Sequence, residues 1–478
     1  MFPCRDVRAF IEALEKEGEL VRVDAEVDCN LELAAIVSRA SAQDGKALLF
    51  ERIKGYPEGY SFLANTLGSY SRVALALGLD KDTPAADIVS VCRQRIKTPL
   101  KPRLVSRAQA PCKENIHADE ELDLFEFPTP FWHRGDGGRY FGTFHCLAVK
   151  DPDSSWVNVA LCRLMIHSEG ELGILMEPGQ HTDLIYQKYK ARGQNMPVAI
   201  SVGQDPVNVI AASASFEAGV CEWDIAGALR EAPVEMVACE TLDMAVPATS
   251  EIVIEGEVLV DELKEEGPFG EFTGYYGGSR APRPFIRINC LTHRHQPVHT
   301  GSLEGKPVLE DHIMSGLMAS VSLENYLKGE LNLGIKQAFV HPWGAGLGLI
   351  VSLKPRFPGY VNRVAHAVWS IKAGRAINFI LAVDEDIDPT DLNQVLWAIC
   401  TRCKPDRDIH IALRSQTTSL WPALTPDERR QGLGSKALID ATFPPEWPRE
   451  WVPVVSDWWD YPEDIRARVE SRWESYGL

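Results

Sequence analysis

The 478-residue chain lacks the features that mark membrane, secreted and nucleic-acid-binding proteins. No apolar run approaches the ~20 residues that a bilayer-spanning helix needs, and the first residues lead into an amphipathic pattern instead of a signal peptide. Basic residues are in deficit, because 49 Lys and Arg stand against 67 Asp and Glu and give a net charge of -18. We therefore predict a cytoplasmic protein with no membrane or nucleic-acid partner.

Paired cysteines are also scarce. Eleven cysteines are scattered along the chain, and only Cys400 and Cys403 have the Cys-x-x-Cys spacing. No second pair completes a zinc site, and no thioredoxin-like unit surrounds the first. The sequence therefore predicts free thiols in a reducing compartment.

The pattern divides the chain into three predicted domains, 1–115, 116–310 and 311–478. In the first, Asp6 can cap a helix with an apolar face at helical spacing, formed by Val7, Phe10, Ile11 and Leu14. Strands at 19–23 and 47–50 and a helix at 31–42 follow. This predicts an α/β module whose last helix ends near Lys97-Thr98-Pro99.

The central part holds short apolar runs separated by Gly, Pro and Asp. The runs are Thr143–Val149, Val157–Ile166, Pro197–Val202, Ile252–Leu259 and Phe285–Leu291. Short strands with turn signals between them predict an antiparallel barrel or sandwich. A helix is expected within it at about 224–230.

The third part returns to alternating helices and strands. Leu347–Leu353 and Asn378–Val383 are typical of strands buried on both faces, with a crossover helix at Val364–Ala373 between them. The tail carries Trp447, Trp451, Trp458, Trp459 and Trp473. Such a tail is typical of packing against a neighbouring domain or subunit.

The most informative segment is Glu265–Tyr275, in which carboxylates flank a Gly-Pro-Phe-Gly break. Gly-Pro forbids a continued helix and favours a tight reversal, so Glu266 and Glu271 can converge. Two converging carboxylates need a cation between them, or one keeps its proton and acts as a general acid. The alternative is an ordinary solvated loop, which the aromatic neighbours disfavour.

Polar residues also interrupt apolar segments elsewhere. Asn158 and Arg163 lie within one buried-looking run, His181 follows a turn, and Glu222 opens a helix. Asn158, His181 and Glu222 together would suit Mg²⁺ or Mn²⁺ better than zinc. Taken singly, each could instead satisfy backbone groups or a helix N-terminus.

Together these segments resemble the UbiD family of decarboxylases, which use prenylated FMN. The resemblance covers essentially the whole chain. It is carried by Asp136-Gly137-Gly138-Arg139, Asn158-x4-Arg163, Gln180-His181, Glu222-x3-Ala226-Gly227, Glu266-Gly-Pro-Phe-Gly-Glu271, the acidic segment Val383–Asp388 and Leu396-Trp397-Ala398.

The resemblance implies a site around the cofactor phosphate. Asn158, His181 and Glu222 would hold a manganese ion that bridges to the phosphate, with Asp224 as a competitor for Glu222. Trp156 and the backbone of 212–218 would form a potassium site. Family members usually offer a lysine to the phosphate where this chain has Asn378, and Lys372 and Arg375 are the nearby substitutes.

The resemblance also implies a site for the chemistry. Arg163 would lie between Glu266 and Glu271, with Glu271 as proton donor and Arg163 orienting the substrate carboxylate. Gln180 and Phe272 would border the substrate, together with residues near Asp311-His312 and Ser419-Leu420-Trp421. The expected reaction is reversible, non-oxidative decarboxylation of an aromatic, heteroaromatic or α,β-unsaturated acid through a covalent adduct with prenylated FMN.

The resemblance further implies a central split β-barrel of flavin-binding type and a C-terminal α/β oligomerisation domain. A homodimer or homohexamer is expected, with a flavin prenyltransferase as cofactor supplier. The acidic cluster Asp384, Glu385, Asp386 and Asp388 is interpreted as structural. Two alternatives remain, a metal-assisted hydrolase that uses the paired carboxylates and a non-catalytic flavin-binding subunit.

Overall fold

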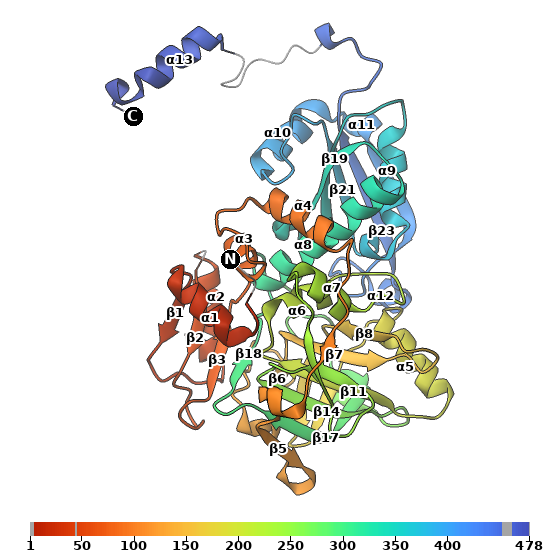
Figure 1. Ribbon diagram of the computed structural model, residues 1–478. Helices are drawn as coiled ribbons and strands as arrows, with labels where there is room; N and C mark the ends of the chain where they lie inside the picture. The colour runs from red at the N-terminus through yellow and green to blue at the C-terminus, as the bar shows by residue number, and fades with distance from the viewer. Residues whose placement is uncertain (1–3, 44, 452–460, 478) are drawn as a thin grey trace.

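The computed structural model describes residues 4–43, 45–451 and 461–477. Figure 1 shows the three parts of the chain in succession, with the N-terminal module at one side, a curled sheet below and a second α/β layer above. No helix within the described residues is both long enough and apolar enough to cross a membrane. All eleven cysteines are free, as predicted.

The N-terminal module is built as the sequence predicts. Helix α1 (Val7–Lys16) is capped by Asp6, whose carboxylate accepts a hydrogen bond from the Ala9 amide at 2.8 Å, and it buries its predicted apolar face. The other elements are β1 (Leu20–Val23), α2 (Glu32–Ser41), β2 (Ala47–Phe50), β3 (Ser61–Ala64), α3 (Tyr70–Ala76) and α4 (Ala85–Arg95). The sheet order is β1-β2-β3-β18, so β18 (Val298–Thr300), from far along the chain, completes it.

The central part of the chain forms a curled antiparallel half-barrel. Its strand order is β6-β9-β10-β17-β14-β11-β7-β8, with β5 paired to β17. The bounds are β5 (Asn115–Ala118), β6 (Tyr140–Gly142), β7 (His145–Lys150), β8 (Val157–Ala160), β9 (Leu164–Ser168), β10 (Glu171–Ile174), β11 (Met196–Val202), β14 (Ile252–Val258) and β17 (Phe285–His293). Within the described residues β6 and β8 do not pair with each other, so the sheet stays open.

Shorter elements frame the half-barrel. The helices are α5 (His181–Ala191), α6 (Pro206–Ala212) and α7 (Glu222–Leu229). Two small sheets are formed by β4 (Arg103–Leu104), β12 (Glu235–Ala238) and β13 (Ala245–Pro247), and by β15 (Lys264–Glu266) and β16 (Ala281–Arg283).

One prediction in this region is wrong. The run Val157–Ile166 is not one strand, because residues 161–163 leave the sheet between β8 and β9. Asn158 therefore lies in β8, whereas Arg163 lies in the link between the two strands. The strands and the link between them are all buried or partly buried, so the apolar pattern continues through the break and periodicity alone does not reveal it.

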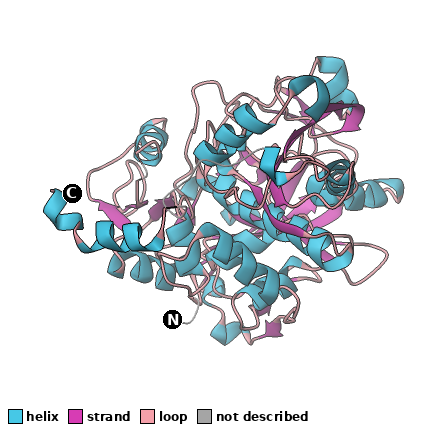
Figure 2. Cartoon of the chain, turned by 90° about the horizontal axis from the view of Figure 1, so that it is seen from above, coloured by secondary structure: helices cyan, strands magenta, loops and turns pink. Residues whose placement is uncertain are grey.

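The C-terminal part is an α/β layer with sheet order β19-β20-β21-β23-β22. It contains α8 (Glu310–Glu324), β19 (Ile335–Val340), β20 (Gly348–Leu353), α9 (Tyr360–Trp369), β21 (Phe379–Val383), α10 (Leu392–Arg402), α11 (Pro405–Asp408), β22 (Ile409–Gln416), α12 (Pro426–Gln431) and β23 (Leu433–Ala441). The predicted strands β20 and β21 pair in parallel, and α9 is the crossover helix. Seen from above, helices lie on both sides of the magenta strands (Figure 2).

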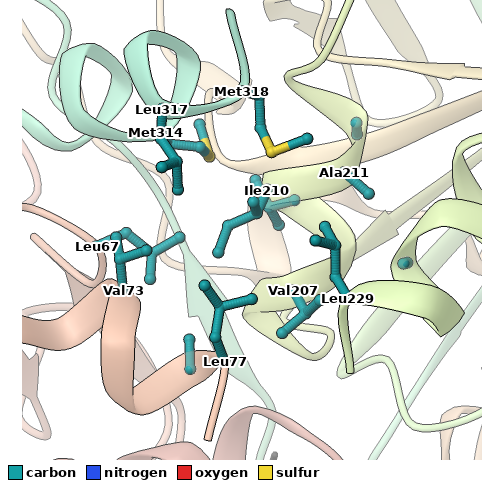
Figure 3. Close-up of a cluster of buried hydrophobic side chains, with 14 of the residues drawn as sticks. Leu67, Val73, Leu77, Val207, Ile210, Ala211, Leu229, Met314, Leu317 and Met318 are labelled. Carbon is teal, nitrogen blue, oxygen red and sulfur yellow. The ribbon is translucent and has the colours of Figure 1, made fainter. Parts of the chain in front are cut away.

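A shared apolar core joins the three parts. Figure 3 shows side chains from α3, α6, α7 and α8 meeting in one cluster, which includes Leu77, Ile210, Leu229 and Leu317. All four of these leucine and isoleucine side chains are fully buried. The cluster fixes α6, α7 and α8 against one another, and these helices form one wall of the cavity described below.

The C-terminal tail extends away from this core in Figure 1, where α13 (Glu463–Ser471) stands apart from the rest of the chain. Trp451 and Trp473 are exposed, whereas Trp447 packs beside Phe443 with ring centroids 6.5 Å apart. Trp458 and Trp459 lie outside the described residues. The contact with another subunit that the tail suggested stays a prediction.

The acidic cluster has a structural environment. The buried Arg402 guanidinium pairs with Asp384 at 3.0 Å and with Asp386 at 2.6 Å. It also lies over the Trp397 ring at 4.9 Å from the centroid and over the Phe443 ring at 5.0 Å. Asp384 and Asp386 therefore anchor α10 to the end of β21, in agreement with the structural interpretation of these two residues; for Glu385 and Asp388 it stays a prediction.

Candidate active site

A cavity of about 420 Å³ lies between the half-barrel, the helices α5 to α8 and the segment that follows α9. Its lining includes most of the residues that the sequence singled out. They are Asn158, Arg163, Gln180, His181, Glu222, Glu271, Phe272, Asp311 and Leu420, together with Glu177, Glu304, Met314 and Lys372. Residues from the second and third predicted domains thus meet around one space, whereas no described residue of the first domain belongs to this lining.

At one end of the cavity Arg163 binds two glutamates. Its Nε and Nη2 atoms donate to the two oxygens of Glu266 at 2.9 and 2.8 Å, and Nη1 donates to Glu271. Tyr140 Oη donates to Glu266 at 3.0 Å. The guanidinium also lies 5.3 Å from the centroid of the Phe269 ring. The predicted convergence of Glu266 and Glu271 on one cation is present in this geometry.

The backbone of 266–277 makes this convergence possible. Gly267 has a φ of +81°, a left-handed conformation that favours glycine, and it turns the chain directly after Glu266. Gly277 lies against Glu271, since a Cβ atom there would come within 2.7 Å of Oε1. Asp136 holds the loop from the other side by accepting from the Gly270 amide at 3.0 Å and from the His133 amide at 2.8 Å.

Burial and neighbouring charges shift the pKa values of Glu271 and Arg163 in this network. Burial raises the pKa of Glu271 to about 7, with Arg163 opposing the rise and the Glu266 charge adding to it. Burial alone would lower the pKa of Arg163, but the charges of Glu271 and Glu266 outweigh it and raise that pKa. The site therefore combines a fixed cation with a carboxyl group that can hold a proton near neutral pH.

A second polar cluster lies along the same cavity. Asn158 in β8 donates to Thr182 Oγ1 at 3.1 Å, and Glu222 accepts from the Val159 amide at 2.7 Å. His181 and Glu222 are the first residues of α5 and α7. Helix N-termini favour anions, because their first amides lack intrahelical partners.

The cation nearest to this cluster is Lys372. Its Nζ atom donates to His181 Nδ1 at 3.0 Å and to the Phe216 carbonyl at 3.2 Å. Burial lowers the pKa of Lys372 to about 8, although the Glu222 charge opposes that. Burial, and next Lys372, lower the pKa of His181 to about 4, so its ring is neutral and can act as a ligand.

The structure separates the two acids that compete for the metal role. Glu222 is buried and lines the cavity, and burial raises its pKa to about 7. Asp224 is not part of the cavity lining. Trp156 is not part of it either, but its ring stands edge-on to His181 with centroids 5.0 Å apart, and its Nε1 donates to the Val220 carbonyl at 2.8 Å.

The sequence suggested Lys372 or Arg375, in place of the lysine expected at Asn378, as the basic residue for the cofactor phosphate, and one of these two lines the cavity. Asn378 is buried beside Thr417, whose Oγ1 donates to the asparagine side chain at 2.7 Å. Arg375 pairs with Glu177 at 3.4 Å. Lys372 is the cation of this trio that lines the cavity. The sequence pointed to Lys372 only because it lies near Asn378 in the chain. Its contact with His181 joins residues 191 positions apart, which no local pattern predicts.

Three further acidic side chains line the cavity, and of these the sequence indicated Asp311 but neither Glu177 nor Glu304. Glu177 accepts from Thr418 Oγ1 at 2.8 Å and from the Ser419 amide at 3.1 Å, which brings the predicted 419–421 segment to the site through Leu420. Glu304 lies with Asp311, and burial followed by the Asp311 charge raises the pKa of Glu304 well above its ordinary value. Glu304 and Glu177 carry no motif that would have revealed them.

His312 supports the part of the cavity that Phe272 lines, although His312 itself does not belong to the lining. Its Nε2 donates to the Phe272 carbonyl at 2.5 Å, and its Nδ1 accepts from the Leu309 amide at 3.0 Å. The imidazole therefore ties the loop that carries Glu271 and Phe272 to the start of α8.

Comparison with known proteins identifies the family. Three models described as the N-terminal, Rift-related and C-terminal domains of 3-octaprenyl-4-hydroxybenzoate carboxy-lyase match residues 11–92, 103–307 and 312–441. The chain belongs to the UbiD family of carboxy-lyases. The resemblance noted in the sequence is thus confirmed.

Individual UbiD relatives match over nearly the full length. Pyrrole-2-carboxylic acid decarboxylase of Pseudomonas aeruginosa is 32% identical, over 99% of this chain and 98% of its own. The closed form of vanillic acid decarboxylase from Sedimentibacter hydroxybenzoicus superposes with a TM-score of 0.89 at 32% identity, covering 99% of both chains. An evolved dimeric form of the UbiD-class enzyme HmfF from Pelotomaculum thermopropionicum, in complex with prFMN, has a TM-score of 0.81 at 30% identity, covering 96% of this chain and 99% of that one.

These relatives favour a carboxy-lyase over the metal-assisted hydrolase that the paired carboxylates had also suggested. They also agree with the observed α+β architecture and its antiparallel half-barrel.

Proposed function

We propose that this UbiD-family chain catalyses the reversible, non-oxidative decarboxylation of an aromatic, heteroaromatic or α,β-unsaturated carboxylic acid with prenylated FMN. The observation that carries the proposal is the buried Glu266–Arg163–Glu271 network at the end of a cavity that also holds Lys372 and His181. A network of this kind offers a carboxylate-binding cation and a proton donor side by side.

The donor set of the cavity fits a flavin phosphate and a divalent ion. Asn158, His181 and Glu222 supply two oxygen donors and one neutral imidazole, a set that suits Mn²⁺ or Mg²⁺. Lys372 and the N-termini of α5 and α7 supply positive charge for the phosphate. Trp156 and the 212–218 backbone are proposed to hold K⁺, and the half-barrel is proposed to be the flavin-binding split barrel.

Prenylated FMN, when bound, would accept the electron pair that CO₂ leaves behind, which no side chain can do. Arg163 orients the substrate carboxylate, because it is the buried cation at that end of the cavity. Glu271 holds the proton that replaces CO₂ on the substrate carbon, in keeping with its pKa of about 7. Glu266 fixes the guanidinium with two hydrogen bonds, whereas Glu271 accepts one from it and keeps its second oxygen for proton transfer.

The lining suggests the kind of acid that fits. Leu175, Met314, Phe272 and Leu420 give apolar surface for a ring or an unsaturated chain. Glu304 and Asp311 add acceptors for a phenolic hydroxyl or a ring N–H. Gln180 borders the same space. Hydroxylated or nitrogen-containing aromatic acids are therefore the first substrates to screen, and unsaturated aliphatic acids the second.

The experiment that tests the proposal is production together with a flavin prenyltransferase, followed by mass spectrometry of the released small molecules. We expect the mass of FMN plus a five-carbon unit, and CO₂ release from at least one acid in the screen. Glu271→Gln should retain the flavin and lose turnover by about 10²–10⁴-fold, the usual contribution of a general acid. Full activity of Glu271→Gln would refute its role, and folded protein without flavin would refute the cofactor.

A further inference from the structure

A separate group of metal-ligating side chains lies outside the central cavity. His117 belongs to β5, Glu126 to the short helix Leu124–Glu126, and His293 is the last residue of β17. None of the three lines the cavity. Figure 1 shows β5 beside β17 at the lower end of the molecule.

The strand register brings the two histidines together. β5 and β17 pair antiparallel with His117 opposite Leu291, so His293 occupies the diagonal position on the same face. The Nε2 atoms of the two rings lie 3.1 Å apart. The chain then turns and returns Glu126 to this face, where one ligand atom from each of the three residues lies within 4.8 Å of the others.

The 3.1 Å spacing of the two nitrogens fits a direct hydrogen bond between the rings, and it is also close to the spacing of two ligands that share one ion. Tetrahedral zinc with bonds of about 2.0–2.1 Å separates its ligand atoms by about 3.3 Å. His293 Nδ1 is 2.8 Å from the Arg294 carbonyl, so Nδ1–H donates there and leaves the Nε2 lone pair directed at His117. A histidine ligand usually donates its other ring N–H in this way.

The third ligand is also held by a neighbour. Tyr60 Oη donates to Glu126 Oε1 at 2.7 Å, which leaves the second carboxylate oxygen available. Phe127 packs edge-on against the His293 ring with centroids 5.3 Å apart. His117 and Glu126 are partly exposed while His293 is buried, so water can reach an open fourth position.

We propose that His117, Glu126 and His293 form a second metal site, which binds one divalent ion of the zinc class. Two imidazoles and one carboxylate are a zinc-type donor set, whereas Mg²⁺ and Ca²⁺ prefer oxygen ligands alone. The ion clips the 117–126 segment to the end of β17. This site is independent of the proposed function, because it shares no residue with the cavity.

The test is equilibrium dialysis of the full-length holoenzyme against Zn²⁺, followed by elemental analysis. Glu126→Gln and His117→Ala should each hold one equivalent of zinc fewer than the wild type. The matched control is His295→Ala, since His295 is an exposed neighbour that contacts Asn115 at 3.2 Å and is not one of the three proposed ligands. Its zinc content should equal that of the wild type.

Two further variants separate this site from its surroundings. Tyr60→Phe should weaken zinc binding by about 10–100-fold, the usual effect of removing a partner of a metal ligand. His181→Ala, which alters the cavity, should keep the equivalent that depends on Glu126. Equal zinc content in folded Glu126→Gln and wild-type protein would overturn the proposal and leave the histidines as a hydrogen-bonded pair.

Discussion

Replacing Glu266 by glutamine should shift the pH dependence of turnover toward acid. Glu266 and Glu271 bind the same guanidinium, and the Glu266 charge contributes to the raised pKa of Glu271. For two carboxylates that share one guanidinium we take a separation on the order of 6 Å, at which Coulomb repulsion is about 2.8 kcal/mol for an effective dielectric constant of about 20. One pKa unit corresponds to about 1.36 kcal/mol, so removing the Glu266 charge lowers the pKa of Glu271 by about 2 units at most.

The direction of the shift follows from the role proposed for Glu271. The proton donor is active below its pKa, which is about 7 in the native site. The alkaline limb of kcat/KM, which reports the free enzyme, should therefore move from about pH 7 toward about pH 5 in Glu266→Gln. The measurement is CO₂ release against pH with flavin-loaded enzyme and the best acid of the screen.

The sequence offers a matched control next to Glu266. Glu265 is exposed, and Glu265→Gln makes the same chemical change one position away without touching the network. Its profile should follow the wild type. An unchanged alkaline limb in Glu266→Gln would refute the coupling between the two glutamates. If turnover is too low for a profile, carboxyl ¹³C NMR of Glu271, assigned with Glu271→Gln, gives the pKa directly.

Three other perturbations have defined outcomes. Lys372→Ala should weaken flavin retention by about 10–100-fold, as expected for the loss of one hydrogen bond to a charged group. Lys404→Ala, at an exposed site, should retain the flavin as the wild type does. Equal flavin retention in Lys372→Ala and the wild type would exclude Lys372 as a phosphate partner. Arg402→Ala removes the cation from the partly buried Asp384, whereas the half-exposed Asp386 is rehydrated, and it should lower the free energy of unfolding in urea by about 1.5–3 kcal/mol; a loss below about 0.5 kcal/mol would contradict this. Burial raises the pKa of Glu310 to about 7, so the folded chain binds that proton more tightly than the unfolded chain. The resulting stability is present below the ordinary carboxyl pKa of about 4.3 and is lost as pH rises through about 7, and Glu310→Gln should lose less stability across this range in urea titrations at several pH values.

The sequence predicts structure well where the information is local. Asp6 and the spacing of Val7, Phe10, Ile11 and Leu14 fix the start and the buried face of α1, since a cap and a helical stripe need only a few neighbouring residues. The Gly-Pro-Phe-Gly break is local as well. The residues of this break alone predict that Glu266 and Glu271 converge, and the structure shows Arg163 bound to both.

Long-range contacts are harder to predict. Lys372 reaches His181 across 191 positions, and Thr418 reaches Glu177 across 241. No spacing rule links residues so far apart, because the contact depends on how the C-terminal layer packs on the half-barrel. β18 joins the N-terminal sheet for the same reason, although it follows the half-barrel in sequence.

The break between β8 and β9 explains how Asn158 and Arg163 can both line the same cavity. Asn158 lies in β8, and Arg163 lies in the link that leaves the sheet before β9. A continuous strand would alternate its side chains between opposite faces, so residues five apart would point to opposite sides of the sheet. The break lets Asn158 and Arg163 both face the cavity, one toward the proposed phosphate end and the other toward the glutamates. The short link between β8 and β9 thus sets the distance between the residues proposed to anchor the cofactor and those proposed to transfer the proton, and this explains why the error in the strand prediction falls at the site.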